Sequence, residues 1–436
     1  MRVYKFGGTS LGSAERMHQA AEIINDGQPK IVVLSAMSGT TNILTSLCHE
    51  LQNSNHNQYL KEVQSLRVQY TQVMNSFNFT EKTKCKAENL INDIFIFLES
   101  CINRSFDYNI SAQIVAKGEL LSTHLFLYLL LDKNINATII PALSFMRIDK
   151  DSEPDIYYLK ENIHRELEKN PGCSLFITQG FICRDVKGNI SNLGRGGSDY
   201  SATLIGSAVG AEEIQIWTDI DGVHNNDPRF VENTQPIEKL SFDEAAELAY
   251  FGAKILHPTS MLPAKESNIP VLLKNTLEPK ATGTRISDQV EGQGVKAVAA
   301  KDGITSIIIH SGRMLMAYGF LRRVFEIFER YKTPIDMITT SEVGIALTID
   351  DTSRLELILE DLKELATVKV YPDQTIISVV GQMETETKGI ANRIFEALND
   401  IPLRMISYGA SDNNISFLIK TSEKKVALES LSNHLF

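Results

Sequence analysis

The stretch Leu193-Gly194-Arg195-Gly196-Gly197-Ser198-Asp199-Tyr200 decides how we interpret this chain. It follows an apolar run, Leu175-Phe176-Ile177, that is typical of a buried parallel strand, and a turn-rich hairpin around Lys187-Gly188-Asn189. Glycines before a helix let backbone N–H groups approach a ligand closely, and the N-terminus of a helix favours an anion. Arg195 stands among these glycines, and Asp199 follows four residues later. The stretch therefore predicts a loop that presents a cation and a carboxylate to one cavity.

Two similar loops occur near the start of the chain. The strand-like run Val3-Tyr4-Lys5-Phe6 leads into Gly7-Gly8-Thr9-Ser10, and the apolar run 31–36 leads into residues 37–42. A segment with helical spacing, residues 14–25, lies between them. This order predicts an α/β fold with a mainly parallel central sheet sandwiched by helices. In such sheets ligands bind outside the carboxyl ends of the strands, where both loops lie.

A fourth polar loop, residues 218–229, follows the strand-like run 213–217. Together with Lys5, the four loops supply glycine N–H donors, hydroxyl groups and cations, which phosphoryl transfer needs around charge that is spread over oxygens. The chain has no Walker A sequence, no protein-kinase signature and no nucleophile elbow. It also has no spaced His and Cys ligands for a metal and no G-x-G-x-x-G after its first strand. We therefore expect phosphoryl transfer outside the standard kinase classes, with no metal-ligating residues.

The composition bounds the class of protein. Its 436 residues predict two or three domains, and a formal net charge of −11 argues against a nucleic-acid surface. The N-terminus lacks a signal-peptide core, and the apolar run 120–131, in a helix predicted over 112–131, is too short to span a bilayer. The five cysteines include no C-x-x-C pair, which favours reduced thiols. We expect a cytoplasmic protein with neither nucleic acid nor a membrane as partner.

The last third of the chain contains an internal repeat. Gly319 followed by Arg323-Val324-Phe325-Glu326 is echoed by Gly389 followed by Arg393-Ile394-Phe395-Glu396. Strand and helix patterns around both segments follow a βαββαβ order. A duplicated small α+β unit is therefore expected, and the loops that carry chemistry all precede it.

Six motifs in order resemble those of aspartokinase, and the resemblance covers essentially the whole chain. They are Lys5-Phe6-Gly7-Gly8-Thr9-Ser10, Ser35-Ala36-Met37-Ser38-Gly39-Thr40-Thr41-Asn42, Gly118-Glu119-Leu120-Leu121-Ser122, Leu193 to Tyr200, Trp217-Thr218-Asp219 with Asp227-Pro228-Arg229, and Gly252-Ala253-Lys254-Ile255-Leu256-His257-Pro258. The chain most resembles the monofunctional, lysine-sensitive type, and we expect no homoserine dehydrogenase part. The resemblance implies an amino-acid kinase domain at residues 1–290 and two ferredoxin-like βαββαβ ACT domains, at residues 300–371 and 372–436.

The resemblance implies transfer of the γ-phosphoryl group of ATP to the β-carboxylate of L-aspartate, with Mg²⁺ neutralising the phosphates. This reaction is the first step of lysine, threonine and methionine (diaminopimelate) biosynthesis. Lys5 would contact the transferring group, and Asp199 would hold the cationic groups in position. The residues implied for aspartate binding are Thr41, Glu119, Arg195 and Ser198. The residues implied for ATP binding are Lys5, Gly7, Gly8, Ser10, Thr218, Asp219, His224, Arg229 and Lys254. His224 is a departure, because many relatives have a tyrosine there.

Lysine is the effector that the resemblance implies. Its ligands would be in the first repeat, at Met314, Asp336, Ser341 and Glu342. A second departure is that Met316 and Ala317 stand where lysine-sensitive relatives commonly have His and Ser, so polar contacts are lost. The repeats also predict a homodimer through the ACT domains, or a dimer of dimers. A role as dimer interface alone is the alternative for the repeats.

Other interpretations of the same residues stay open. Taken singly, Lys5 and Arg229 are typical surface charges, Glu119 is a typical helix-face acid, and His257 before a proline favours a cap or packing role. Another kinase of the same superfamily would act on glutamate, carbamate or a nucleoside monophosphate. A non-catalytic amino-acid sensor would keep the fold, but it has no need of the phosphoryl clamp that Lys5, Arg195 and Asp199 form together.

Overall fold

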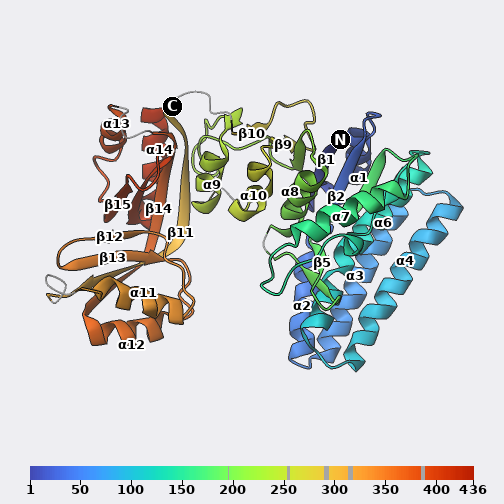
Figure 1. Ribbon diagram of the computed structural model, residues 1–436, viewed down its shortest axis with the longest axis horizontal. Coiled ribbons are helices and arrows are strands. Elements are labelled where there is room, and N and C mark those ends of the chain that lie inside the picture. Colours follow the sequence, from blue (N-terminus) through green and yellow to red (C-terminus); the bar gives the residue numbers. More distant parts are fainter. Residues whose placement is uncertain (195, 253–255, 289–293, 313–317, 384–387) are drawn as a thin grey trace. The chain divides into compact units, whose positions relative to one another are not determined.

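The computed structural model describes residues 1–436 except 195, 253–255, 289–293, 313–317 and 384–387 (Figure 1). The chain forms two compact units. The first unit comprises Met1–Val223, Glu238–Phe242 and Leu256–Val290, and the second unit comprises His224–Ile237, Asp243–Ile255 and Glu291–Phe436. The chain therefore leaves the first unit and returns to it twice before the repeats begin.

The core of the first unit is a sheet of eight strands among the described residues, in the order β3-β4-β2-β1-β7-β9-β10-β8. These strands are β1 (Arg2–Phe6), β2 (Lys30–Leu34), β3 (Thr138–Ile139), β4 (Leu175–Gln179), β7 (Ile214–Thr218), β8 (Lys239–Leu240), β9 (Val271–Asn275) and β10 (Thr284–Ile286). Neighbours from β3 to β9 are parallel, and β9 and β10 are antiparallel. Every residue of β2 and β4 is buried, as in strands covered on both faces. The predicted mainly parallel sheet is confirmed.

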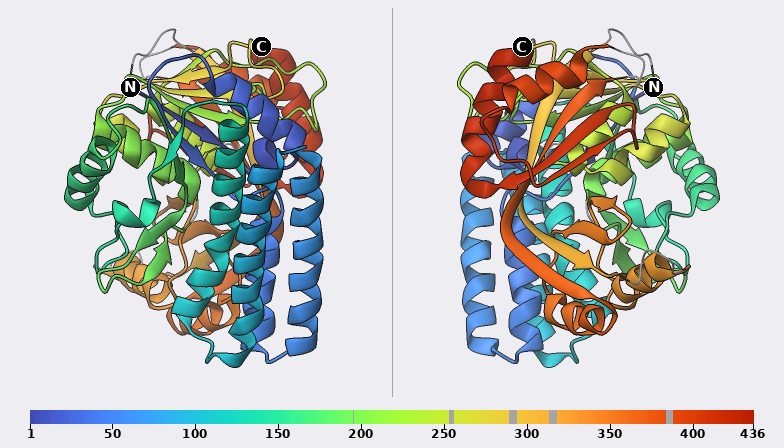
Figure 2. Two further views of the ribbon diagram at one scale, coloured as in Figure 1. Left: turned by 90° about the vertical axis from the view of Figure 1, so that its right-hand side faces the viewer. Right: turned by 90° about the vertical axis from the view of Figure 1, so that its left-hand side faces the viewer.

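Helices cover this sheet. They are α1 (Ala14–Ile24), α2 (Thr40–Gln52), α3 (His56–Ser76), α4 (Glu81–Ser100), α5 (Tyr108–Val115), α6 (Lys117–Asp132), α7 (Ile156–Glu168), α8 (Gly197–Val209) and α10 (Pro258–Glu266). The long helices α3 and α4 stand side by side and pack on α2 and α6 (Figure 2). One apolar core joins helices α1 to α6 to the sheet, which confirms the predicted helical cover. The antiparallel hairpin of β5 (Ile182–Arg184) and β6 (Ile190–Asn192) confirms the turn expected between them.

The segment predicted as one helix over residues 112–131 is helical but divided into two elements. Two helices, α5 and α6, meet there at Ala116. Gly118 follows the break, and a Cβ on it would lie 2.8 Å from the Cβ of Ala36, so the chain passes close to the loop after β2. By length and hydropathy Tyr108–Asp132 is the one candidate membrane span among the described residues, and 67% of its window is buried inside the protein. A core helix passes the same test.

The second unit contains a six-stranded antiparallel sheet among the described residues, in the order β12-β13-β11-β14-β16-β15. Its strands are β11 (Gly294–His310), β12 (Ile338–Thr340), β13 (Gly344–Ile349), β14 (Thr367–Gln382), β15 (Met405–Tyr408) and β16 (Asn414–Lys420). Its helices are α11 (Phe320–Arg330), α12 (Leu355–Leu365), α13 (Ile390–Ala397) and α14 (Lys424–Leu435). Helix α9 (Phe242–Tyr250) also belongs to the second unit, except for its first residue.

The two repeats share their longest strands. The end of β11, from Ile304 to His310, pairs with the start of β14, and the start of β11 pairs with the end of β14. The first repeat has its own apolar core between α11, α12 and the sheet. The core of the second repeat includes Val298 from the start of β11, as well as residues of β14, β16 and α14. The expected duplication is therefore present, with the first repeat placed inside the second.

We expect the helical core to depend on Phe95 of α4, which is fully buried and packs near Tyr70, with ring centroids 6.4 Å apart. Replacement Phe95→Ala should lower the free energy of unfolding by about 3–5 kcal/mol, because the lost burial is combined with a cavity. Urea unfolding followed by circular dichroism measures this change. The neighbouring residue Ile96 is 60% exposed, so Ile96→Ala is the matched control and should change stability by less than about 0.5 kcal/mol. Equal losses from both variants would contradict the packing described here.

Candidate active site

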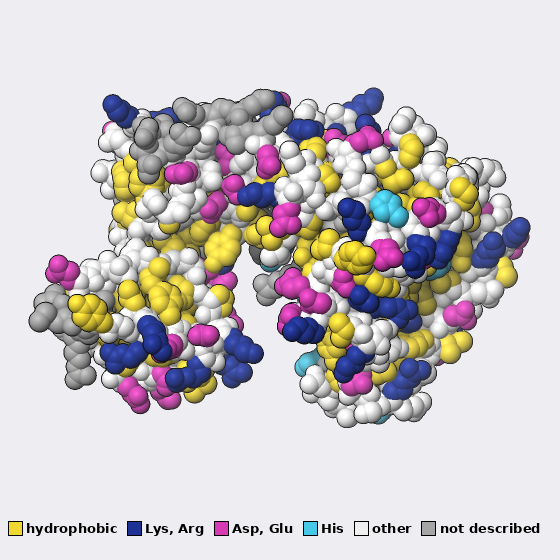
Figure 3. Space-filling view, in the orientation of Figure 1, with side chains coloured by type: hydrophobic (Ala, Val, Ile, Leu, Met, Phe, Trp, Pro, Cys, Tyr) yellow, Lys and Arg dark blue, Asp and Glu magenta, His cyan; other side chains and the backbone are white. Residues whose placement is uncertain are grey.

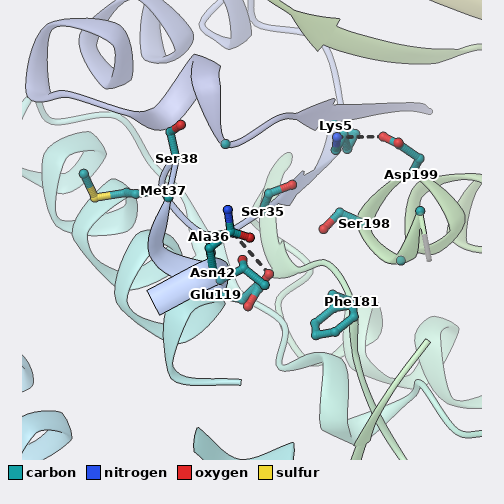
Figure 4. A pocket seen from close by; sticks show the side chains of 15 residues that line it. Lys5, Ser35, Ala36, Met37, Ser38, Asn42, Glu119, Phe181, Ser198 and Asp199 are labelled. Atoms are coloured by element: carbon teal, nitrogen blue, oxygen red, sulfur yellow. Dashed lines mark hydrogen bonds and ion pairs between the residues drawn. The ribbon is translucent and has the colours of Figure 1, made fainter. Parts of the chain in front are cut away.

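A pocket of about 350 Å³ lies in the first unit at the carboxyl ends of β1, β2 and β4 (Figure 4). The N-terminal turns of α2, α6 and α8 also reach it. The starts of α2 and α8, which follow Gly39 and Gly196, bring the positive ends of two helix dipoles to its rim. The predicted site residues that line it are Lys5, Gly8, Thr41, Glu119, Ser198 and Asp199. The structure thus brings together residues from four separate motifs.

An ion pair between Lys5 and Asp199 spans one side of the pocket. The Nζ of Lys5 lies 2.6 Å from Oδ1 of Asp199, and the two side chains are only 11% and 16% exposed. Lys5 ends up here because it precedes the last residue of β1, and Asp199 because it is in the first turn of α8. A lysine that is largely removed from water keeps its charge most easily beside a carboxylate. The pair therefore presents a fixed cation to the pocket.

Glu119 lies on another wall of the pocket, and Figure 4 shows it beside Ala36. It is in the first turn of α6 and only 3% exposed. Its Oε1 accepts a hydrogen bond of 3.2 Å from the N–H of Ala36, whereas Oε2 has no hydrogen-bond partner among the described residues. Burial raises the pKa of Glu119 to about 7, an effect that the hydrogen bond from Ala36 only partly offsets. Such a carboxylate is suited to a ligand ammonium group, which would restore its usual charge.

The glycine loop after β1 is packed tightly against the loop after β2. The N–H of Ser38 donates to the carbonyl of Gly8 at 3.0 Å, and a Cβ on Gly8 would lie 2.9 Å from the carbonyl oxygen of Ala36. Gly7 donates its N–H to the carbonyl of Trp217. The hydroxyl of Ser10 is buried in the core, where it bonds to Thr276 at 2.6 Å. Ser10 therefore does not line the pocket, although its motif does.

The other predicted nucleotide residues lie outside the pocket lining. Thr218 ends β7, and its hydroxyl donates to Oδ1 of the exposed Asp219 at 3.1 Å. His224 and Arg229 belong to the second unit. There Nδ1 of His224 is 2.8 Å from the hydroxyl of Thr234, and the guanidinium of Arg229 is held by Asp227 at 2.6 Å. The predicted residues Arg195, Lys254 and Met314 lie outside the described residues.

The predicted effector residues have different surroundings in the second unit. The side chain of Asp336 is only 2% exposed, and its Oδ1 lies 2.7 Å from Nζ of Lys301 and 2.9 Å from the hydroxyl of Tyr250. Ser341 and Glu342 are exposed, and the hydroxyl of Ser341 donates to the carbonyl of Gly344. Asp336 is thus already engaged by an internal lysine, which the sequence did not predict.

Some pocket residues escaped prediction. Phe181 lines the pocket, and the backbone N–H of Ala36 binds Glu119. An aromatic residue after a strand carries no sequence signal of a site, and a backbone donor carries none at all. His257 immediately precedes α10, where its ring lies 2.7 Å from the hydroxyl of Thr259, in keeping with the cap or packing role.

Comparison with known proteins gives consistent matches. The pattern of the "Amino acid kinase family" matches residues 1–275, and that of an "ACT domain" matches residues 377–435. The "Lysine-sensitive aspartokinase 3" of Escherichia coli K12 is 34% identical over 447 residues, which cover 100% of this chain and 99% of that protein. Aspartokinase III of E. coli in complex with aspartate and ADP (R-state) has 33% identity, covers 100% of both chains and gives a TM-score of 0.86. The same enzyme in complex with lysine and aspartate (T-state) also has 33% identity. That match covers 100% of this chain and 99% of that one, with a TM-score of 0.83.

The match over residues 1–275 makes the larger part of the chain an amino acid kinase, to which an ACT domain is joined. The full-length similarity is more specific. The chain belongs to the aspartokinase family. The predicted fold class, an amino-acid kinase fold followed by ACT domains, is confirmed. The division into residues 1–290, 300–371 and 372–436 stays a prediction.

We expect the buried carboxyl of Glu119 to lower stability at high pH. Its pKa is about 7 in the folded chain against 4.5 for a free carboxyl. The favourable contribution of the protonated group to the free energy of unfolding is therefore complete below pH 4.5 and is lost as the pH rises through 7. The shift corresponds to about 3 kcal/mol. Glu119→Gln should therefore be more stable than the wild type by up to that amount above pH 8, and the gain should vanish near pH 5.

Urea unfolding at pH 5 and pH 8.5 measures this difference. Glu88 is exposed on α4, so Glu88→Gln removes one carboxylate without changing a buried group and serves as the control. A gain in Glu119→Gln that is the same at both pH values would contradict the raised pKa.

Proposed function

We propose that this chain transfers the γ-phosphoryl group of ATP to the β-carboxylate of L-aspartate, giving ADP and 4-phospho-L-aspartate. This would be the first step of lysine, threonine and methionine biosynthesis. The observation that carries the proposal is the meeting of the Lys5–Asp199 pair and the unneutralised Glu119 in one pocket. Support comes from the relatives, which are named aspartokinases, and from the neighbour that binds aspartate and ADP.

The amino-acid acceptor would be held by its charges. The ammonium of aspartate would face Oε2 of Glu119, the oxygen that has no partner among the described residues. Arg195 would take the α-carboxylate in a bidentate pair, which suits a guanidinium. Thr41 and Ser198 would add hydroxyl contacts from the first turns of α2 and α8. The β-carboxylate would then be directed toward the Lys5 side of the pocket.

Lys5 would stabilise the charge that spreads over the phosphoryl oxygens during transfer. Asp199 would act on Lys5 by keeping its ammonium in place, so little reorganisation is needed as the charge develops. The backbone of Gly8 and the start of α8 would add fixed dipoles, whereas the N–H of Gly7 is already bound to the carbonyl of Trp217. Interactions that strengthen in the transition state raise the rate constant rather than merely improving binding.

The nucleotide would extend from this pocket toward the end of β7. Thr218, Asp219, His224, Arg229 and Lys254 remain the proposed contacts, on the strength of the family motifs. The hydroxyl of Ser10 is hydrogen-bonded to the hydroxyl of Thr276, which argues against a direct contact between the Ser10 side chain and the nucleotide.

Mg²⁺ is the expected companion of ATP in this reaction. No group of three or more His, Cys, Asp or Glu side chains that would hold a metal occurs among the described residues. We expect the ion to be held mainly by the nucleotide phosphates and water, as is usual for Mg²⁺ in phosphoryl-transfer sites. When bound, the ion would neutralise phosphate charge.

The reaction can be tested by trapping the acyl phosphate with hydroxylamine. With ATP, Mg²⁺ and L-aspartate, the wild type should form the hydroxamate, and Lys5→Ala should form it at least about a hundredfold more slowly, because a fixed transition-state cation is lost. Lys150 is 84% exposed, so Lys150→Ala is the control for removal of one positive charge and should keep its activity.

The alternatives give different results in the same assay. Products from glutamate, carbamate or a nucleoside monophosphate in place of aspartate would indicate another kinase of the superfamily. A folded wild type that binds ATP but yields no product with any of them would indicate an amino-acid sensor.

We also propose lysine as the effector, bound in the first repeat. The neighbour solved with lysine and aspartate supports this. Asp336 offers one buried carboxylate oxygen, Oδ2, without a hydrogen-bond partner among the described residues, although Lys301 already neutralises its charge. A ligand ammonium would therefore share Asp336 with Lys301. A homodimer through the ACT domains, or a dimer of dimers, fits the exposed apolar side chains Leu321 and Phe325 on α11.

Calorimetric titration with lysine, threonine and methionine tests the effector. We expect binding heat from lysine alone and a weaker response in Asp336→Asn, because the ammonium then loses its anionic partner. Absence of heat with about 1 mM lysine would contradict the proposal. In that case an interface role remains for the repeats.

A further inference from the structure

The end of β4 carries an unusual turn beside the pocket. Phe181 has a φ of 66°, a left-handed conformation that bulky L-residues avoid. The other non-glycine residues with positive φ in the described part of the chain are Ser, Asn, Asp and Lys. The N–H of Ile182 donates to the carbonyl of Gly180 at 2.7 Å, so these residues form a γ-turn with positive central φ, the rare and strained form. Backbone strain of this kind concentrates at functional sites.

Hydrogen bonds fasten the turn to α8. The N–H of Phe181 donates to Oγ of Ser201 at 2.9 Å, and the hydroxyl of Ser201 donates to the carbonyl of Gly197 at 2.7 Å. On its other side, the carbonyl of Phe181 accepts from the N–H of Leu193 at 2.9 Å. The strained conformation is therefore held by partners on both sides of the glycine loop.

The turn also touches the start of α8 directly. A Cβ on Gly197 would lie 2.4 Å from Cδ2 of Phe181, and a Cβ on Gly180 would lie 2.7 Å from Cβ and Oγ of Ser198. Real side-chain atoms do not approach so closely, so neither glycine has room for a methyl group. The residue after Ser198 is Asp199, which holds Lys5. A displacement of the turn would therefore be passed to the ion pair through the first turn of α8.

A packing role alone does not explain this residue. Phe181 is only half-buried, and its ring lines the pocket in Figure 4 near Ser198. A left-handed turn that served only to connect β4 to the hairpin would be better satisfied by glycine or asparagine. The strained backbone occurs at the residue whose ring packs against Gly197.

We propose that Phe181 is a positioning residue for phosphoryl transfer. Its turn and ring together fix the first turn of α8, so that Asp199 holds the ammonium of Lys5 in place in the pocket. This inference rests on the proposed function for its catalytic consequence. Its structural part, the dependence of the Lys5–Asp199 pair on Phe181, is measurable without that function.

The test compares Phe181→Gly, which accepts the left-handed turn but removes the ring, with Phe181→Tyr, which keeps both. In Phe181→Gly we expect kcat to fall about tenfold to a hundredfold, because the fixed cation is misplaced, while the KM for ATP changes by less than about threefold. Removal of backbone strain should offset part of the stability lost with the half-buried ring, so the thermal midpoint should change little. Phe181→Tyr should keep kcat within about threefold of the wild type. Ser201→Ala, which removes the partner of the Phe181 N–H, should lower kcat in the same direction.

A second readout follows Lys5 itself. Its rate of labelling by an amine-acylating reagent, measured by peptide mass spectrometry, should rise in Phe181→Gly because the pair with Asp199 loosens. Ser152 also has positive φ, 65°, and is exposed, so Ser152→Gly is the matched control and should change neither kcat nor labelling.

Three results would overturn the proposal. One is kcat and Lys5 labelling in Phe181→Gly that stay within about twofold of the wild type. Another is a loss of activity in both Phe181→Gly and Ser201→Ala that is fully accounted for by a smaller fraction of folded protein. A third is labelling that rises equally in Ser152→Gly. If labelling changes as expected but the wild type does not phosphorylate aspartate, the positioning role stands and the proposed function fails.

Discussion

The pocket of the first unit is built around one ion pair, between the ammonium of Lys5 and the carboxylate of Asp199, 2.6 Å apart and largely withdrawn from water. Removing an ammonium from water costs free energy unless a carboxylate compensates it. The pair therefore requires β1 and α8 to meet at one edge of the sheet, and α8 does pack on β1, β2 and β7. The parallel order of these strands, the two glycine loops and the tight turn after β4 all serve that meeting.

Glu119 is the opposite case to this ion pair, because it is a buried acid that lacks a partner of opposite charge among the described residues. Its carboxyl is buried without a cation among the described residues, and burial raises its pKa to about 7. A pocket with one compensated cation and one uncompensated acid fits the proposed binding of a ligand that carries its own positive charge. The cost of keeping Glu119 unsatisfied is a loss of stability in the free protein, which is a common price of a binding site.

Sequence patterns predicted a large part of this arrangement because the determinants are local. Buried parallel strands read as apolar runs, and glycine loops at their ends identify the edge where Lys5, Glu119 and Asp199 meet. Burial of single polar groups was not predictable. Glu119 alone resembles a surface acid of a helix, and the hydroxyl of Ser10 is engaged in the core although its motif borders the pocket. The break at Ala116 and the internal partner of Asp336 likewise depend on tertiary contacts that no spacing encodes.

The shared strands of the second unit have a consequence for the order in which the chain is made. The start of β11 and Val231 belong to the core of the second repeat, whose last helix, α14, is the end of the described chain. The amide of Asn226 donates to the carbonyl of Leu428, 202 residues later. During synthesis the first repeat can close on itself, whereas the segment around Asn226 has to wait until α14 has left the ribosome. The loop that follows β7 thus reaches its final place later than the parallel sheet, and a chain released before α14 is made would carry that loop still unanchored.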